Sequence, residues 1–289
     1  MRLRKLGKTG LEVSEIGLGT EFLREQSKNT VISVIQEAIK HGINYFDIVF
    51  NISEYINNIS LAIKDYRDQI ILTCHLGAIE KNGKHQRTRS IEACEQTFLK
   101  TLSQFGKGYI DIVNIQFVKE NEYESIIASG GLLDLAKRLQ QEGKAKFIGI
   151  STHDISICQK AVMSGHFDLI MNQINLVNHT LPGRKVFLET CKKEEVGLVA
   201  MKPFARGKLL QRNRTVNIAK YQSGGISIKK KIPRDITPIK CLSYTLSQTG
   251  VSTTIPGVKN IQELKENLAY LNASDEEKDF TSIMNEFNV

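Results

Sequence analysis

The chain has 289 residues, of which 41% are hydrophobic, so it is long enough to bury a sizeable core. Lysine and arginine number 39 against 31 for aspartate and glutamate. Nine basic residues and no acidic residue lie between Arg206 and Arg234, so the positive excess is local and does not favour a nucleic-acid-binding protein. A signal peptide and an apolar run of membrane-spanning length are both absent, which predicts a cytoplasmic protein with no membrane partner.

The five cysteines are scattered along the chain and form no Cys-x-x-Cys pair. Metal sites and disulfide frameworks use closely and regularly spaced cysteines. We therefore expect buried, reduced thiols and no metal site.

Short β-branched segments alternate with longer amphipathic segments along the chain. Eight strands are predicted, over residues 14–19, 43–47, 70–73, 110–115, 147–150, 169–173, 198–201 and 252–255. Helices with one apolar face are predicted between them, among them 31–40, 91–102, 132–141 and 261–271. Because strand and helix alternate eight times, the sequence predicts an α/β fold, a (β/α)₈ TIM barrel in which residues 1–289 form one domain.

Three segments lie outside this alternation. Residues 6–13 contain glycine turns and predict a β-hairpin that closes the bottom of the barrel. Residues 211–235 are polar and basic, and loops of that length are usually functional or disordered. Residues 275–287 predict an extra, polar C-terminal helix with Ser274 at its N-cap.

Barrels of this class carry their chemistry at the C-terminal ends of the strands. Polar residues occupy the ends of six predicted strands. They are Asp47, His75, Gln116, the run Ser151 to His153, the pair Asn172 and Gln173, and Lys202. We expect these side chains to converge on one mouth.

Five segments, in the expected order, resemble the aldo-keto reductase superfamily. They are residues 6–20, 42–47, 143–151, 200–207 and 254–267. The run Met201-Lys202-Pro203 is similar to the seventh-strand loop of the bacterial and archaeal branch. That branch often carries a cysteine-rich, ferredoxin-like C-terminal extension, which this chain lacks.

The resemblance implies that NADP or NAD lies extended across the barrel mouth. It places Ser151, Thr152, Asn172, Gln173 and Met201 at the nicotinamide, Lys202, Arg206, Gly207 and Lys208 at the pyrophosphate, and Pro256, Gly257, Lys259, Glu263 and Asn267 at the adenosine end. The basic segment after strand seven is also consistent with solvated charge. Glu263 disfavours a 2′-phosphate whereas Lys259 favours one, so both cofactors remain open.

The resemblance also places the family's Asp, Tyr, Lys and His at Asp47, Ile52, His75 and Gln116, so one of the four residues is retained. Two alternatives concern the proton donor. A two-residue slip puts Phe50 in place of the Tyr, and Tyr55 reaches the mouth if the loop is rebuilt.

Two hypotheses follow for the chemistry. In the first, Asp47 and His75 form an acid-base pair that supports an altered oxidation or reduction of a small carbonyl or alcohol substrate, or a non-redox proton abstraction or elimination. In the second, the chain has lost its chemistry and keeps cofactor or ligand binding. An NAD(P)-dependent oxidoreductase is the leading expectation, and the sequence leaves the oligomeric state and the substrate open.

Overall fold

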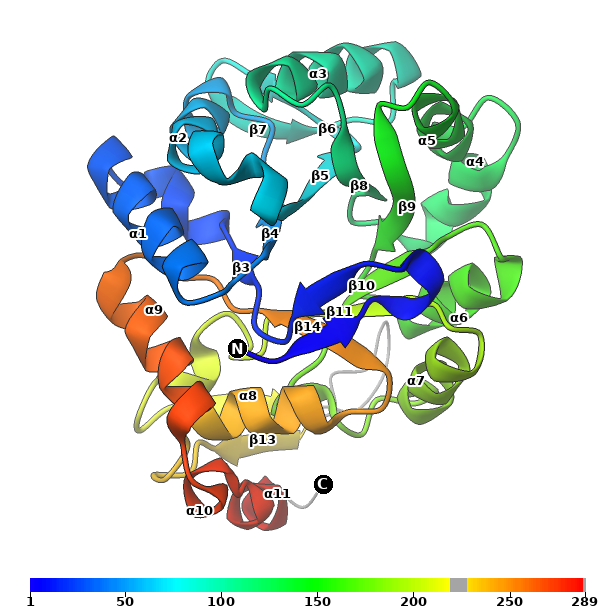
Figure 1. Ribbon diagram of the computed structural model, residues 1–289. Helices are drawn as coiled ribbons and strands as arrows, with labels where there is room; N and C mark the ends of the chain where they lie inside the picture. The colour runs from blue at the N-terminus through cyan, green and yellow to red at the C-terminus, as the bar shows by residue number, and fades with distance from the viewer. Residues whose placement is uncertain (219–227, 288–289) are drawn as a thin grey trace.

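The computed structural model describes residues 1–218 and 228–287 and contains an eight-stranded parallel sheet (Figure 1). The strands are β3 (Leu18–Gly19), β4 (Tyr45–Ile48), β5 (Ile71–Leu76), β8 (Ile110–Ile115), β9 (Ala145–Ser151), β10 (Leu169–Gln173), β11 (Gly197–Met201) and β14 (Val251–Ile255), neighbours in that order. Parallel bridges from Ile16 to Thr254 and from Gly19 to Gly257 join the first strand to the last. The predicted barrel is confirmed.

Helices cover the outside of the barrel (Figure 1). They are α1 (Lys28–Lys40), α2 (Ser53–Ile63), α3 (Ile91–Gln104), α4 (Tyr123–Ile127), α5 (Leu132–Gln141), α6 (Ile155–Ser164), α7 (Arg184–Lys193), α8 (Pro238–Ser247) and α9 (Ile261–Leu268). The side chains of Ser27 and Ser90 accept backbone hydrogen bonds at the starts of α1 and α3. Within the described residues, no helix is long and apolar enough to cross a bilayer.

The N-terminal hairpin closes one end of the barrel. Strands β1 (Leu3–Lys5) and β2 (Glu12–Ser14) pair antiparallel, and Leu6 and Val13 are fully buried against the barrel interior. A Cβ atom at Gly197 would lie 2.8 Å from the Leu6 side chain, which shows how closely the plug packs. The hairpin is confirmed, whereas the strand predicted over 14–19 is shorter because Ser14 pairs with Leu3 instead.

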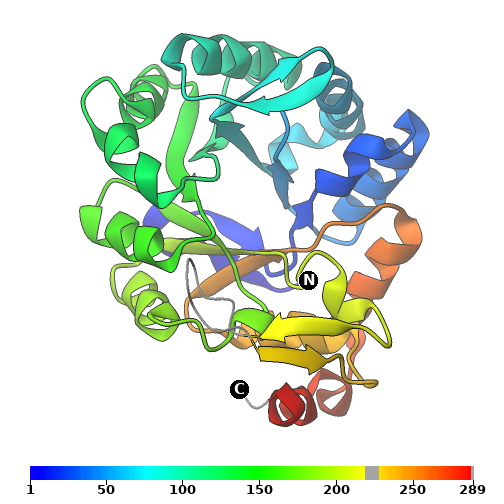
Figure 2. The same cartoon turned by 180° about the vertical axis from the view of Figure 1, so that it is seen from behind.

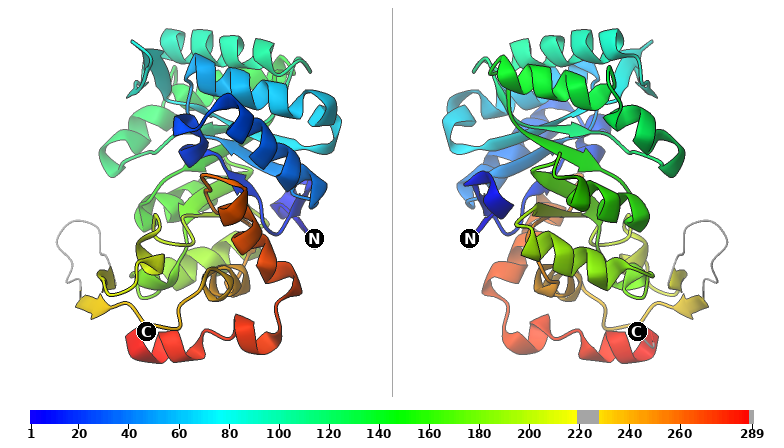
Figure 3. Two further views of the ribbon diagram at one scale, coloured as in Figure 1. Left: turned by 90° about the vertical axis from the view of Figure 1, so that its left-hand side faces the viewer. Right: turned by 90° about the vertical axis from the view of Figure 1, so that its right-hand side faces the viewer.

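Two further hairpins stand at the opposite end of the barrel (Figures 2 and 3). They are β6 (Ala78–Lys81) with β7 (Lys84–Arg87), and β12 (Thr215–Ile218) with β13 (Ile228–Lys231). The second lies in the segment predicted as a long loop, of which Lys220 falls outside the described residues.

The hairpin of β6 and β7 turns at Asn82 and Gly83, whose φ angles of 52° and 70° suit a type I′ turn. It also supports the start of α2. Ile52 is the N-cap residue of α2, and its side chain has no oxygen to accept a hydrogen bond from the first turn of the helix. A carboxylate oxygen of Glu80 instead accepts from the backbone N–H of Ser53 at 3.2 Å.

The prediction of one C-terminal helix is wrong, because the segment forms α10 (Asp275–Lys278) and α11 (Thr281–Phe287). The carboxylate of Asp279 accepts from the backbone N–H of Thr281 at 2.9 Å and from its hydroxyl at 2.6 Å, which starts the second helix. Ser274 caps α10 as predicted.

Candidate active site

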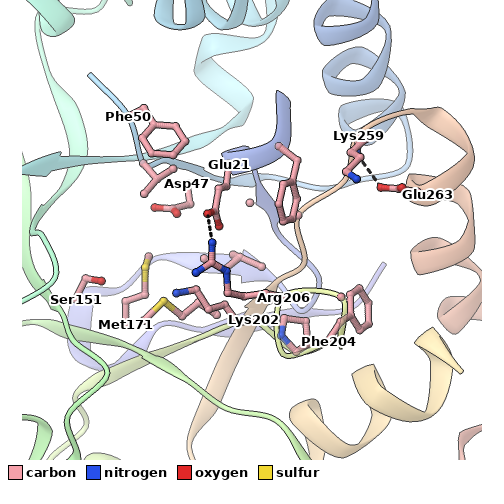
Figure 4. Close-up of a pocket in the computed structure, with 18 of the residues that line it drawn as sticks. Glu21, Asp47, Phe50, Ser151, Met171, Lys202, Phe204, Arg206, Lys259 and Glu263 are labelled. Carbon is pink, nitrogen blue, oxygen red and sulfur yellow. Dashed lines mark hydrogen bonds and ion pairs between the residues drawn. The ribbon is translucent and has the colours of Figure 1, made fainter. Parts of the chain in front are cut away.

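A cavity of about 590 Å³ opens at the C-terminal ends of the barrel strands, within the size range of ligand pockets. The predicted residues that line it are Asp47, His75, Gln116, Ser151, His153, Met201, Lys202, Arg206, Gly207, Gly257, Lys259, Glu263 and Asn267. Figure 4 shows Asp47 and Ser151 at one end of the cavity, here called the inner end, Lys259 and Glu263 at the other, and the pair Arg206 and Glu21 between them. The part from Arg206 to Glu263 is here called the outer end. The expectation of one shared mouth is confirmed for these residues.

The inner end holds a buried carboxylate–imidazole pair. Oδ1 of Asp47, at the end of β4, lies 2.7 Å from Nε2 of His75 on β5. The side chains are only 8% and 1% exposed, respectively. The other ring nitrogen of His75, Nδ1, is buried and has no hydrogen-bond partner among the described residues.

The segment after Asp47 places Phe50 in the cavity wall, whereas Ile52 and Tyr55 do not line it. Thr20 donates to the backbone carbonyl of Asp47 at 2.6 Å, so the Tyr55 hydroxyl donates to Oγ1 of Thr20. Burial raises the pKa of Tyr55 well above its ordinary value. This placement in the core does not favour Tyr55 as a proton donor.

Gln116 follows β8 and faces the cavity, with its amide donating to the carbonyl of Val49 at 2.8 Å. The next residue, Phe117, has a φ of 46°, which non-glycine residues seldom adopt. Lys202 and Arg206 share this left-handed conformation, with φ angles of 58° and 61°. Backbone strain of this kind concentrates at functional sites, and here three strained residues line one cavity.

Lys202 extends into the cavity from the end of β11, and its Nζ lies 2.8 Å from Nε2 of His153. Burial lowers the pKa of Lys202, and the nearby Arg206 lowers it further, while Glu21 and Asp47 act in the opposite sense.

Charged residues at the outer end are half-buried or exposed, and they are loosely paired. A guanidinium nitrogen of Arg206 lies 3.7 Å from a carboxylate oxygen of Glu21 (Figure 4). The carboxylate of Glu263 accepts from the backbone N–H of Lys259 at 2.8 Å, beside the N-terminus of α9. Glu263 therefore supports the turn before α9 as well as lining the cavity.

Some predicted cofactor residues do not line the cavity, namely Thr152, Asn172, Gln173, Lys208 and Pro256. The buried ones tie strand ends together. The Thr152 hydroxyl donates to the carbonyl of Val118 at 2.8 Å, and the Asn172 amide donates to the carbonyl of Thr152 at 2.8 Å. Lys208 is exposed. The cofactor contacts expected of these five residues stay predictions.

Several lining residues escaped the sequence reasoning, among them His85, Arg87, Phe117 and Met171. His85 and Arg87 belong to β7, and the Asn82-Gly83 pair was the available signal for that hairpin. Phe117 and Met171 carry no polar group that would mark a site. Among the described residues, no group of three or more His, Cys, Asp or Glu side chains is placed to hold a metal ion.

Comparisons with known proteins agree with this architecture. A profile of the aldo/keto reductase family matches residues 15–286. "Uncharacterized oxidoreductase YqkF" of Bacillus subtilis (strain 168) is 27% identical over 94% of this chain and 92% of its own length. L-galactose dehydrogenase of Arabidopsis thaliana is 24% identical over 93% of this chain and 88% of its own length.

Among solved structures, the holo form of aldo-keto reductase AKR11C1 from Bacillus halodurans superimposes with a TM-score of 0.77 at 22% identity. The superposition covers 96% of this chain and 94% of the AKR11C1 chain, which shows a common fold. Because the family profile matches nearly the whole chain, this protein belongs to the aldo/keto reductase family.

Proposed function

We propose that residues 1–289 act as one domain, an NAD(P)(H)-dependent oxidoreductase for a small carbonyl or alcohol substrate. In this proposal His75, held by Asp47, transfers the proton. The observation that carries it is the buried 2.7 Å contact between Asp47 and His75 at the inner end of the cavity. Family membership and oxidoreductase relatives support the reaction class.

The cavity residues fit a nicotinamide dinucleotide. At the inner end, Ser151 has a hydroxyl without a partner among the described residues, and Met201 offers an apolar, polarizable surface. Arg206 and Lys259 farther out supply cations suited to phosphates. When bound, the dinucleotide supplies or accepts the hydride.

The contacts of His75 suit a proton relay at the substrate oxygen. With Asp47 ionised, Nε2 of His75 donates to Oδ1, which leaves Nδ1 of the neutral ring as an acceptor. Because Nδ1 is buried in the unliganded cavity, the proposal requires that substrate binding brings an oxygen within hydrogen-bond distance of it. Nδ1 then takes the proton of a substrate hydroxyl during oxidation and returns it to the developing alkoxide during reduction. Asp47 stabilises the imidazolium that forms between these events.

The same pair supports the alternative of a proton abstraction or elimination that needs no hydride. A third possibility is a protein that binds the cofactor without turnover. All three require a ligand in the cavity, so the test has to separate binding from redox turnover.

Binding is measured by titration calorimetry with NADPH, NADP⁺, NADH and NAD⁺. Absence of heat with all four at millimolar concentration would contradict the proposal. Turnover is measured as loss of the reduced-nicotinamide absorbance with a panel of aldehydes and ketones, and as its gain with alcohols. Binding without any turnover would favour the non-redox or silent alternatives. The same titrations compare the affinities for NAD and NADP.

A further inference from the structure

The hairpin of β6 and β7 presents two nitrogen-bearing side chains to the inner end of the cavity. His85 and Arg87 alternate along β7 with the exposed Lys84 and Gln86, so they share one face of the strand, and both line the cavity. The hairpin follows β5 after the single residue Gly77. These two side chains are therefore tied closely in sequence to the strand that carries His75.

Aromatic rings hold both side chains in place. The ring of Phe50 packs edge-on against His85 with centroids 4.9 Å apart. The guanidinium carbon of Arg87 lies 5.4 Å from the centroid of Phe117. Both rings belong to the cavity wall, so the hairpin is docked at the site and does not project freely into solvent.

The charges beside the hairpin do not cancel. Arg87 and Arg89 both pair with the carboxylate of Glu122. Arg89 also donates to the carbonyls of Gln116 at 2.9 Å and of Phe117 at 3.2 Å, and it does not line the cavity. Two guanidinium groups on one carboxylate leave one net positive charge, and Arg87 is the member that faces the cavity.

Both side chains also keep unused hydrogen-bonding capacity. Nε of Arg87 and Nδ1 of His85 are buried and have no partner among the described residues. Burial lowers the pKa of His85, and the neighbouring His75 and Arg24 lower it further, so the ring is neutral near pH 7. A neutral imidazole carries its proton on either nitrogen, so Nδ1 can donate.

We propose that His85 and Arg87 bind a carboxylate group of the substrate, so that the substrates are carbonyl acids and the corresponding hydroxy acids. This inference rests on the proposed redox function at His75. A guanidinium with one net charge suits a monoanion, and its planar geometry suits a carboxylate. The neutral His85 adds a hydrogen bond without adding a second charge.

The test compares carboxylated aldehydes with neutral aldehydes of similar size. The pairs are 4-oxobutanoate with butanal and 4-carboxybenzaldehyde with benzaldehyde. We expect kcat/KM to favour the carboxylated member of at least one pair by about 10- to 100-fold, the usual effect of one charge-assisted contact. Arg87→Gln should remove most of that preference and Arg87→Lys should retain part of it.

Lys84→Gln is the matched control, because it removes the same charge from the exposed face of the same strand. It should leave the preference unchanged. If Lys84→Gln lost the carboxylate preference as much as Arg87→Gln, the subsite would be refuted and a long-range charge effect indicated. A preference for glyceraldehyde 3-phosphate over glyceraldehyde that depends on Arg87, with no preference for carboxylates, would overturn the proposed substrate class.

Binding of unreactive terephthalate, measured by saturation-transfer NMR, separates this proposal from the redox proposal. Terephthalate binding that Arg87→Gln weakens and Lys84→Gln does not would support the subsite even if no aldehyde is turned over. Turnover of neutral aldehydes without any carboxylate preference or terephthalate binding would leave the redox function and refute the subsite. Thermal unfolding curves check that both variants are folded.

Discussion

The two ends of the cavity hold their charges in different ways. At the inner end, Asp47 and His75 are buried and bonded to each other at 2.7 Å. At the outer end, Arg206 is 63% exposed and lies 3.7 Å from Glu21. Buried pairs are costly to break, whereas exposed pairs contribute little. Substitutions should therefore have large effects at the inner end and graded effects at the outer end.

The largest effect is expected from His75→Ala, because it removes the proposed proton carrier. The value of kcat/KM should fall by about 10² to 10⁴, the usual contribution of a general acid or base. His166→Ala, at an exposed position, is the control and should behave as wild type. Gln116→Ala should mainly raise KM. Undiminished turnover in the His75 variant would refute the assignment.

A second experiment tries to rebuild the inner end in the form that the family resemblance implies. The triple variant Phe50→Tyr, His75→Lys and Gln116→His should raise turnover of simple aldehydes by at least about tenfold over His75→Ala. The matched triple variant with Tyr at position 52 should gain less, because Phe50 lines the cavity and Ile52 does not. A greater gain from position 52 would instead favour Ile52 as the position that corresponds to the family's Tyr.

These two positions show what the sequence could and could not predict. Seven of the eight barrel strands contain β-branched residues and are predicted from that local pattern, whereas β3 consists only of Leu18 and Gly19. The pairing of Asp47 with His75 is predicted as well, because both residues stand at the ends of neighbouring strands. The segment from Phe50 to Tyr55 has no regular pattern, and its path depends on the hairpin, where Glu80 accepts from the backbone of Ser53.

The hairpin of β6 and β7 also carries the site residues that the sequence did not predict. His85 and Arg87 reach the cavity because Asn82 and Gly83 reverse the chain, and no strand-end rule includes a residue that far beyond β5. Conversely, Thr152 and Asn172 stand at strand ends yet bond to neighbouring backbone. Position at a strand end thus brings a residue near the mouth without deciding which way its side chain points.

At the outer end, Arg206 and Glu21 should have opposite effects on cofactor binding. Arg206→Gln should weaken binding by about 3- to 10-fold, because one exposed cation near phosphates is worth on the order of 1 kcal/mol. Glu21→Gln should strengthen binding slightly, since it removes a competing carboxylate. Arg212→Gln is the control, exposed and outside the cavity lining. Calorimetry at low and high salt measures all three, and equal weakening by Arg206→Gln and Arg212→Gln would contradict a local contact.

The most specific effect is expected at Glu263, where we propose that the outer end selects between NAD and NADP. Glu263→Arg should shift the ratio of the two dissociation constants toward NADP by about tenfold, since a charge change in a partly screened site is worth on the order of 1 to 2 kcal/mol. The carboxylate also accepts from the backbone of Lys259, so the substitution removes a structural contact as well. Glu263→Gln separates the two contributions, because an amide oxygen keeps the acceptor and loses the charge. Gln262→Arg adds the same positive charge at an exposed neighbour outside the cavity lining and should leave the ratio unchanged. An unchanged ratio in Glu263→Arg would show that Lys259 or the basic segment after β11 sets the preference instead.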